Sequence, residues 1–278
     1  MADNFTRSLA HWSEAGRSGM EAFYRLATKD YRHLAEARDW AGWLKSRQAR
    51  AGDRRLRLLD VACGSGKFPT ALIKHAGLAE AGLSPIDYDL LDPAAFSVEE
   101  ARNALAAPFA PAGEHVCTLQ GLQCEPGAFD IVWATHALYA LPRAELDAGL
   151  ARFVDAIAPD GAGFIAQSSE AGHYLRFHRA FLEGFDRGAT EPYTAAEDLA
   201  AALTRLGVAF ETEEITYENG APDAERDAVE GYLQRCLFED EVSLDALQAN
   251  PVTGAYLETC RHGDDWRFSQ SVTLISIG

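Results

Sequence analysis

Residues 58–68 of this 278-residue chain read LLDVACGSGKF, an apolar run followed by a glycine turn of the kind that holds nucleotides. A dinucleotide-binding turn has a third glycine three residues after the second, which allows close packing of the helix that faces the pyrophosphate. Pro69 occupies that position after Gly66, and Asp60 precedes the turn. A carboxylate there repels a pyrophosphate and attracts an ammonium group. The turn therefore favours a nucleoside that carries an ammonium group and no phosphate.

S-adenosylmethionine fits this description, because it carries an ammonium and a sulfonium group and has no phosphate. The segment also resembles the D-x-G-x-G-x-G motif of class I S-adenosylmethionine-dependent methyltransferases, with Ala62 in place of the first glycine and Gly64 and Gly66 at the others. Three later segments look like the next motifs of that class in the same order: DYDLLDPAAFSVEEARNAL, FDIVWATHALYALP and IAPDGAGFIAQ. The resemblance covers residues 56–167.

The resemblance implies S-adenosylmethionine as cofactor and a binding site at the carboxyl ends of the strands. Asp92 ends the second strand and is suited to accept hydrogen bonds from both ribose hydroxyls. Ligands of open α/β sheets bind outside these strand ends, so we expect Gln120, Gly121 and Thr135 beside the adenine and the transferred methyl. The full expected cofactor set is Asp60, Ala62, Gly64, Gly66, Asp92, Ser97, Gln120, Gly121 and Thr135.

Over almost the whole chain, the layout is similar to that of the histamine N-methyltransferase group. The similarity rests on the segments EAFYRLA, THALYAL, QSSEAGHYLRFHRAF, YTAAEDLAAALTRLGV, CLFED, YLETC and FSQSVTLISI. It implies that an amine acceptor is held by His136, Asp30, His173, Phe177 and Gln270. His136 stands where that group has an amide, and several of its tryptophans are missing, so the acceptor implied is not histamine in particular.

Methyl transfer is an in-line displacement at the sulfonium carbon, so the protein mainly aligns the nucleophile and excludes water. A histidine, with an ordinary pKa of ~6.5, can take a proton from an amine at neutral pH, which makes His136 the candidate base or orienting group. Tyr139 would close the pocket, and Tyr24 and Phe177 would belong to aromatic faces that suit a cationic ligand. Each of these side chains has a plain alternative as a packing residue, and Asp30 has one as a solvated carboxylate.

A parallel sheet covered by helices would bring these residues together, because strands and helices alternate after residue 55. We expect strands at 56–61, 85–91, 114–119, 129–134, 163–167, 208–218 and 269–277, and helices at 18–48, 67–75, 97–105, 143–157 and 223–259. Ser97-x-x-Glu100 and Thr194-x-x-Glu197 predict capping boxes at two helix starts.

The fold class expected is α/β: a Rossmann-like methyltransferase domain over residues 56–278. The resemblance implies a seven-stranded sheet whose last strand is antiparallel. Helical insertions at about 172–206 and 222–263, together with an N-terminal helical region over 1–55, would form a lid over the site.

Composition limits the partners. Lysine and arginine number 25 against 42 aspartates and glutamates, a net charge of −17 that disfavours nucleic acids and anionic membranes and favours a cationic small molecule. The five cysteines form no CxxC pair, and His173 and His178 lack the spacing of a helical metal pair, so we expect neither structural disulfides nor a metal. No stretch reads as a signal peptide or membrane span, which predicts a cytoplasmic protein.

The sequence therefore predicts an S-adenosylmethionine-dependent methyltransferase that acts on a small molecule, preferably by N-methylation of an amine or imidazole. O-methylation of a carboxylate or hydroxyl of a small molecule or peptide is the enzymatic alternative, and a protein that binds the cofactor without turnover is the non-catalytic one. A nicotinamide-dependent oxidoreductase is disfavoured by the missing third glycine. No pattern identifies the acceptor or an oligomeric state.

Overall fold

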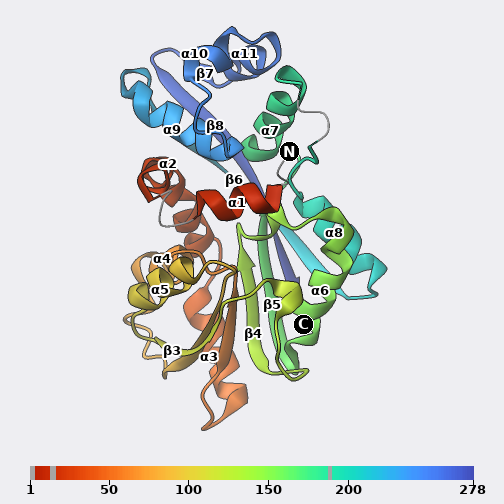
Figure 1. The fold of residues 1–278 in the computed structure, drawn as a ribbon. Helices are drawn as coiled ribbons and strands as arrows, with labels where there is room; N and C mark the ends of the chain where they lie inside the picture. The colour runs from red at the N-terminus through yellow and green to blue at the C-terminus, as the bar shows by residue number, and fades with distance from the viewer. Residues whose placement is uncertain (1–3, 13–16, 187–189) are drawn as a thin grey trace.

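The computed structural model describes residues 4–12, 17–186 and 190–278, with the backbone alone for 17–22, and its centre is one twisted sheet (Figure 1). The strand order is β3-β2-β1-β4-β5-β8-β6, and the short β7 pairs with β8. The strands are β1 (Arg57–Val61), β2 (Ile86–Leu91), β3 (Phe109–His115), β4 (Phe129–Thr135), β5 (Ile157–Ser168), β6 (Phe210–Pro222), β7 (Arg261–His262) and β8 (Asp265–Ile277). The first five are parallel, and β8 is antiparallel to both β5 and β6, which confirms the expected reversal of the last strand.

Helices cover both faces of the sheet because its central strands are apolar on both. Every residue of β4 is buried, and consecutive leucines of β1, Leu58 and Leu59, enter separate cores on opposite faces. One face is covered by α3 (Trp40–Ala51), α4 (Lys67–His75) and α5 (Ala95–Ala104), and the other by α6 (Leu146–Asp155) and α8 (Ala196–Arg205).

A second group of helices stands beyond the carboxyl ends of the parallel strands (Figure 1). It consists of α2 (Arg17–Glu36), α7 (His173–Gly184), α9 (Arg226–Leu237), α10 (Leu244–Ala249) and α11 (Pro251–Glu258), which share one apolar core with the ends of β6 and β8. We call this group the helical lobe. The helix α1 (Asn4–His11) runs across the gap between the helical lobe and the sheet.

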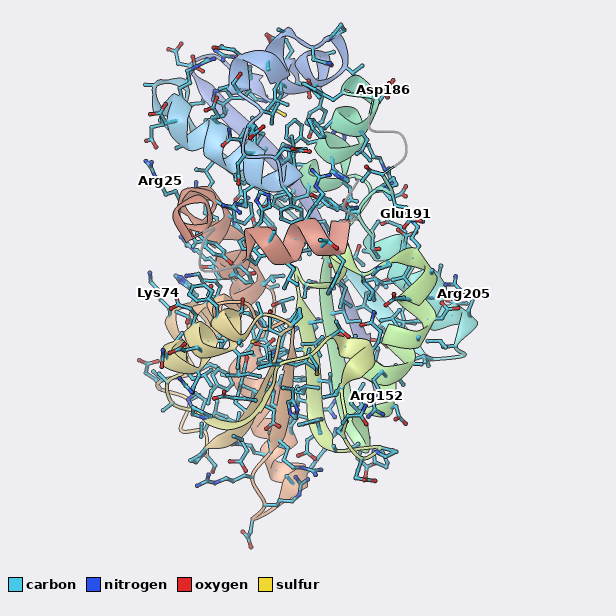
Figure 2. The ribbon with its side chains drawn as sticks, in the orientation of Figure 1. Arg25, Lys74, Arg152, Asp186, Glu191 and Arg205 are labelled. Carbon is cyan, nitrogen blue, oxygen red and sulfur yellow. The ribbon has the colours of Figure 1, made fainter. Side chains whose placement is uncertain are left out.

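Many charged side chains lie at the rim of the molecule (Figure 2). Figure 2 labels six of them: Arg25, Lys74, Arg152, Asp186, Glu191 and Arg205. Within the described residues, no helix is both long enough and apolar enough to cross a membrane.

The predicted helix at 67–75 is confirmed to the residue, whereas the strand predicted at 114–119 is wrong. The observed β3 ends at His115, and a single 3₁₀ turn follows at Leu119–Gly121. The reason is that β3 is an edge strand with Pro111, Ala112 and Glu114 exposed, so it carries no continuous apolar signal.

Both predicted capping boxes are also wrong. The helix α5 begins at Ala95, so Ser97 lies buried inside it. The N-cap residue of α8 is Ala195, whose N–H donates to Oδ2 of Asp198 at 2.9 Å. The observed pair therefore lies one residue after the predicted pair, Thr194 and Glu197.

Candidate active site

A cavity of about 350 Å³ lies between the carboxyl ends of the parallel strands and the helical lobe. The lining residues within 60–68, 91–100 and 118–120 form one wall of this cavity, which we call the sheet side. Its helix side is the remainder, contributed mainly by α1, α2, α9 and residues 135–141 and 167–168. The volume is in the range of small-molecule sites, and the position is where open α/β sheets bind their ligands.

The turn after β1 gives the sheet side its first carboxylate. Asp60 is only 3% exposed and accepts a hydrogen bond at Oδ2 from the Tyr88 hydroxyl at 2.6 Å. Burial raises the pKa of Asp60 to about 7. The backbone then passes through the left-handed region at Ala62 (φ 52°) and Gly64 (φ 51°), which explains why the resembling motif has glycine at both positions.

The second carboxylate is that of Asp92, at the end of β2. Its Oδ2 accepts from the Gly64 N–H at 3.2 Å and its Oδ1 from the Ala94 N–H at 2.9 Å. Burial raises the pKa of Asp92, while these two backbone donors lower it. The two bonds fix the carboxylate at the cavity wall, to which the predicted residues Ser97 and Gln120 also contribute.

Two predicted cofactor residues lie outside the cavity lining. Gly66 is the N-cap of α4 with φ 69°, and a Cβ there would lie 3.2 Å from the Ala101 Cα, so both the backbone conformation and the packing of α4 on α5 favour glycine. The Gly121 N–H turns back to the Thr118 carbonyl at 3.0 Å. Thr135, by contrast, lines the cavity at the end of β4.

The sheet side matches the chemistry of S-adenosylmethionine. Within the described part of the chain, neither Asp60 nor Asp92 has a Lys, Arg or His side chain at ion-pair distance, although both are buried. Burying a carboxylate without a cationic partner is costly. An amino-acid ammonium group and a pair of ribose hydroxyls would supply such partners. The Ser65 hydroxyl also belongs to this wall.

His136 stands on the helix side, directly after β4. Its backbone has φ 50°, and its N–H donates to the Ala166 carbonyl of β5 at 2.8 Å. The imidazole meets the Tyr31 ring edge to face at 5.7 Å, and its Nε2 is buried without a partner. Burial lowers the pKa of His136 to about 4, so the ring is neutral at pH 7.

Asp30 of α2 also lines the helix side, and it is not a solvated carboxylate. It is 3% exposed and accepts hydrogen bonds from the Tyr174 hydroxyl at 2.6 Å and the Asn219 side-chain amide at 2.7 Å. Burial raises the pKa of Asp30 to about 6. The carboxylate is therefore held rigidly and is largely ionised at pH 7.

Aromatic side chains form much of the helix side. The Tyr139 hydroxyl accepts a hydrogen bond from the Trp12 indole N–H at 2.6 Å and lies 3.2 Å from the Ser8 hydroxyl, which ties α1 to the turn after β4. The Lys67 ammonium lies over the Tyr24 ring at 4.7 Å. The aromatic lining comprises Phe5, Trp12, Phe23, Tyr24, Tyr31, Tyr139, Tyr174, Tyr193 and Phe238.

Three predicted acceptor residues, His173, Phe177 and Gln270, lie outside this lining, in the core of the helical lobe. His173 stacks on Phe177 at 5.4 Å and meets the Tyr256 hydroxyl at 2.9 Å through Nδ1. The Gln270 amide donates to the Tyr232 hydroxyl at 3.1 Å. The reason is that β8 extends past the cavity into the lobe and carries Gln270 with it. The expectation that Gln270 faces His136 across the cavity is therefore wrong.

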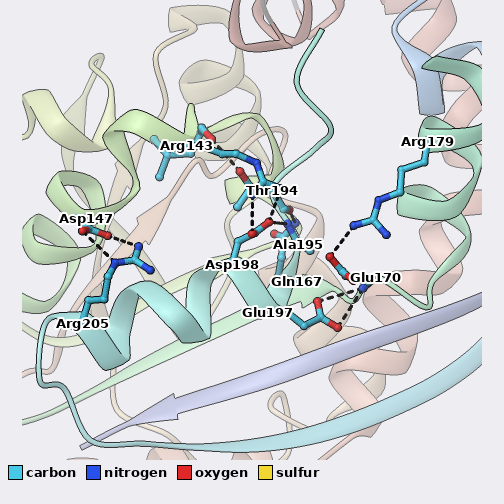
Figure 3. A network of polar contacts seen from close by, with 11 residues as sticks. Arg143, Asp147, Gln167, Glu170, Arg179, Thr194, Ala195, Glu197, Asp198 and Arg205 are labelled. Carbon is cyan, nitrogen blue, oxygen red and sulfur yellow. Dashed lines mark hydrogen bonds and ion pairs between the residues drawn. The ribbon is translucent and has the colours of Figure 1, made fainter. Parts of the chain in front are cut away.

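Sequence reasoning missed Gln167 near the end of β5. This side chain lines the cavity and its amide nitrogen donates to the Thr194 carbonyl at 3.1 Å (Figure 3). A surrounding network holds the start of α8 in place, including the pair of bonds from Arg143 to Asp198 at 2.9 and 3.0 Å. The available signal was a polar residue within the otherwise apolar run GFIAQ.

Comparison with known proteins agrees with this geometry. Residues 58–161 match the family described as "Methyltransferase domain". The chain is 29% identical over 147 residues to the biotin biosynthesis bifunctional protein BioCD of Bordetella avium; the match covers 53% of this chain and only 29% of that protein. The chain thus spans less than a third of the length of this curated relative.

Two solved structures share the fold at low sequence identity. Magnesium protoporphyrin IX methyltransferase from Synechocystis, with S-adenosylhomocysteine bound, is 14% identical with a TM-score of 0.54, over 98% of this chain and 99% of that one. The YcgJ protein from Bacillus subtilis is 14% identical with a TM-score of 0.53, over 84% and 96% of the respective chains.

Residues 58–161 thus form a methyltransferase domain, and the chain has the Rossmann-like fold of class I methyltransferases. Its cofactor is S-adenosylmethionine.

Proposed function

We propose that this chain methylates a nitrogen atom of a small amine. The observation that supports this most directly is Asp30, a buried and rigidly held carboxylate that faces the same cavity as the neutral His136 and many aromatic rings. A carboxylate with aromatic walls attracts a cationic ligand, whereas it repels a carboxylate acceptor. The bound cofactor supplies an electrophilic methyl group on a sulfonium.

In this proposal Asp60 pairs with the cofactor's ammonium group, and Asp92 accepts from the ribose hydroxyls. Ala62, Gly64, Ser97, Gln120 and Thr135 form the surrounding wall. This list of contacts corresponds to the cofactor set expected from the sequence, without Gly66 and Gly121.

The low pKa of His136 favours an orienting role over that of a base, because burial disfavours the imidazolium that a base must become. Its Nε2 would form a hydrogen bond with the acceptor. The proton released on activation of an ammonium is better taken near Asp30, whose pKa of about 6 allows it to hold a proton transiently. Tyr24 and Tyr139 would line the path of the acceptor.

The N-terminal region 1–55 contributes to the lid through α1, and residues 56–278 form the catalytic domain with its helical insertions. By covering the cavity mouth, α1 would exclude water during transfer. We further infer a cytoplasmic enzyme with no nucleic-acid partner, which agrees with the acidic net charge.

Release of S-adenosylhomocysteine from pools of small amines, carboxylic acids and alcohols tests the proposal. We expect turnover with amines only. Asp30→Asn should raise the KM for the amine about 10- to 150-fold, the scale of a hydrogen bond to a charged group, while leaving cofactor affinity unchanged. Asp147→Asn is the matched control, because Asp147 forms an exposed pair with Arg205 outside the cavity. Turnover of acids or alcohols without amines would contradict the proposal.

A further inference from the structure

Unpartnered polar atoms on the cavity wall indicate what the acceptor must offer. Among the described residues of the helix side, two buried side-chain atoms have no hydrogen-bond partner: Nε2 of His136 and Oε1 of Gln167.

The Gln167 amide has a defined orientation. Its nitrogen donates to the Thr194 carbonyl, an atom that accepts hydrogen bonds and cannot donate one. The amide therefore cannot flip without facing oxygen against oxygen, and Oε1 remains an acceptor that needs a donor. The side chain is 1% exposed, so a missing donor is costly for Oε1.

Strand register places Gln167 next to His136. Thr135 is paired with Ala166 between the parallel strands β4 and β5, and the His136 N–H donates to the Ala166 carbonyl. Gln167, the next residue, is thus the neighbour of His136 on the adjacent strand, at the usual spacing of about 4.8 Å between strands.

We propose that Gln167 determines specificity: its Oε1 accepts a hydrogen bond from the reacting nitrogen of the acceptor. Primary and secondary amines then react, whereas tertiary amines, which have no hydrogen on an uncharged nitrogen, do not. This inference rests on the proposed N-methylation and adds which amines are accepted and where methylation ends.

The proposed contact is compatible with the bonds that change. The nitrogen lone pair forms the new N–C bond as the S–C bond breaks, and the electron pair of that bond goes to sulfur. The nitrogen keeps the hydrogen that Gln167 accepts and becomes a positively charged ammonium, which strengthens the hydrogen bond. The ammonium loses a proton to solvent after release. The hydrogen bond to Gln167 is therefore strongest in the transition state, when positive charge develops on the nitrogen.

The test uses the intact chain and 2-phenylethylamine with its N-methyl, N,N-dimethyl and N,N,N-trimethyl derivatives. Turnover is followed as S-adenosylhomocysteine release, and binding of the N-methyl and trimethyl forms is measured by calorimetry with S-adenosylhomocysteine present. Gln167→Met keeps the side-chain length and removes Oε1. Thr194→Val is the control, because it removes the Thr194 hydroxyl bond to the Leu141 carbonyl in the same segment and leaves Oε1 in place.

We expect the wild type to convert the N-methyl form at least tenfold better than the dimethyl form, and to bind it at least tenfold more tightly than the trimethyl form. Gln167→Met should reduce both ratios about tenfold, and Thr194→Val should leave both unchanged. Equal losses for all four probes in Gln167→Met would show a purely structural role and overturn the inference. If the wild type binds S-adenosylhomocysteine but releases none from any amine, the proposed function fails and the inference fails with it.

Discussion

Removing the carboxylate of Asp92 should weaken cofactor binding by a calculable amount. Each oxygen of this carboxylate accepts one backbone N–H, from Gly64 and from Ala94, and retains a lone pair for a ribose hydroxyl. Two hydrogen bonds to a charged acceptor are lost in Asp92→Ala, but water that enters the vacated space recovers part of them. The expected loss is about 1.5–3 kcal/mol, which raises the Kd about 10- to 150-fold.

Calorimetric titration with S-adenosylhomocysteine measures this loss directly. Asp87→Ala is the matched control, because Asp87 lies on the same strand, β2, but forms an exposed ion pair with Arg55. Thermal unfolding of each variant separates a binding defect from a folding defect, since Asp92→Ala also leaves two backbone N–H groups without partners. Wild-type affinity in a folded Asp92→Ala protein would refute the assignment of this carboxylate to the cofactor.

Three further predictions concern the rest of the cavity. His136→Ala should lower kcat and leave the affinity for S-adenosylhomocysteine unchanged. Because the pKa of His136 is about 4, the rates of wild type and variant should depend on pH in the same way between pH 5.5 and 8. An inflection near pH 6.5 in the wild-type profile that the variant lacks would contradict this. The raised pKa of Asp60 means that the free protein loses stability as pH rises from about 4 to 7, while affinity for the cationic cofactor rises up to about pH 7. Asp60→Asn should flatten both slopes in unfolding and calorimetric measurements, and unchanged slopes would argue against this carboxylate as the partner of the ammonium group. Tyr139→Phe leaves the Trp12 indole N–H without its acceptor, so hydrogen exchange in α1 should accelerate, and unaltered protection would show that this bond does not hold the helix.

The sheet could be predicted well because its central strands are short apolar blocks with clear ends. Leu58 to Val61 and the fully buried β4 read as strands from composition alone, and the glycine turn fixed where α4 begins. Edge strand β3 was misplaced because only Phe109 of its residues is buried, so the strand carries no continuous apolar signal.

The acceptor side of the cavity was less predictable because it is assembled from distant segments. Asp30 receives its hydrogen bonds from residues 144 and 189 positions away, so no local pattern indicates that it is buried. Gln270 was misplaced because its position was taken from the family resemblance, and the sequence does not show how far the last strand runs past the cavity. Gln167 was overlooked because a polar residue near the end of an apolar strand usually just marks that end.

The left-handed backbone at Ala62 and His136 has a consequence for affinity. Each of these non-glycine residues, both on the cavity wall, holds a conformation that costs about 1 kcal/mol or more in the unliganded chain. The surrounding sheet holds both turns in this conformation before a ligand binds. The protein backbone therefore loses less conformational entropy on binding. Glycine at either position would relax the chain and loosen the turn. Preorganisation at these two turns is thus maintained at the expense of global stability, and a search for more stable variants should select against it.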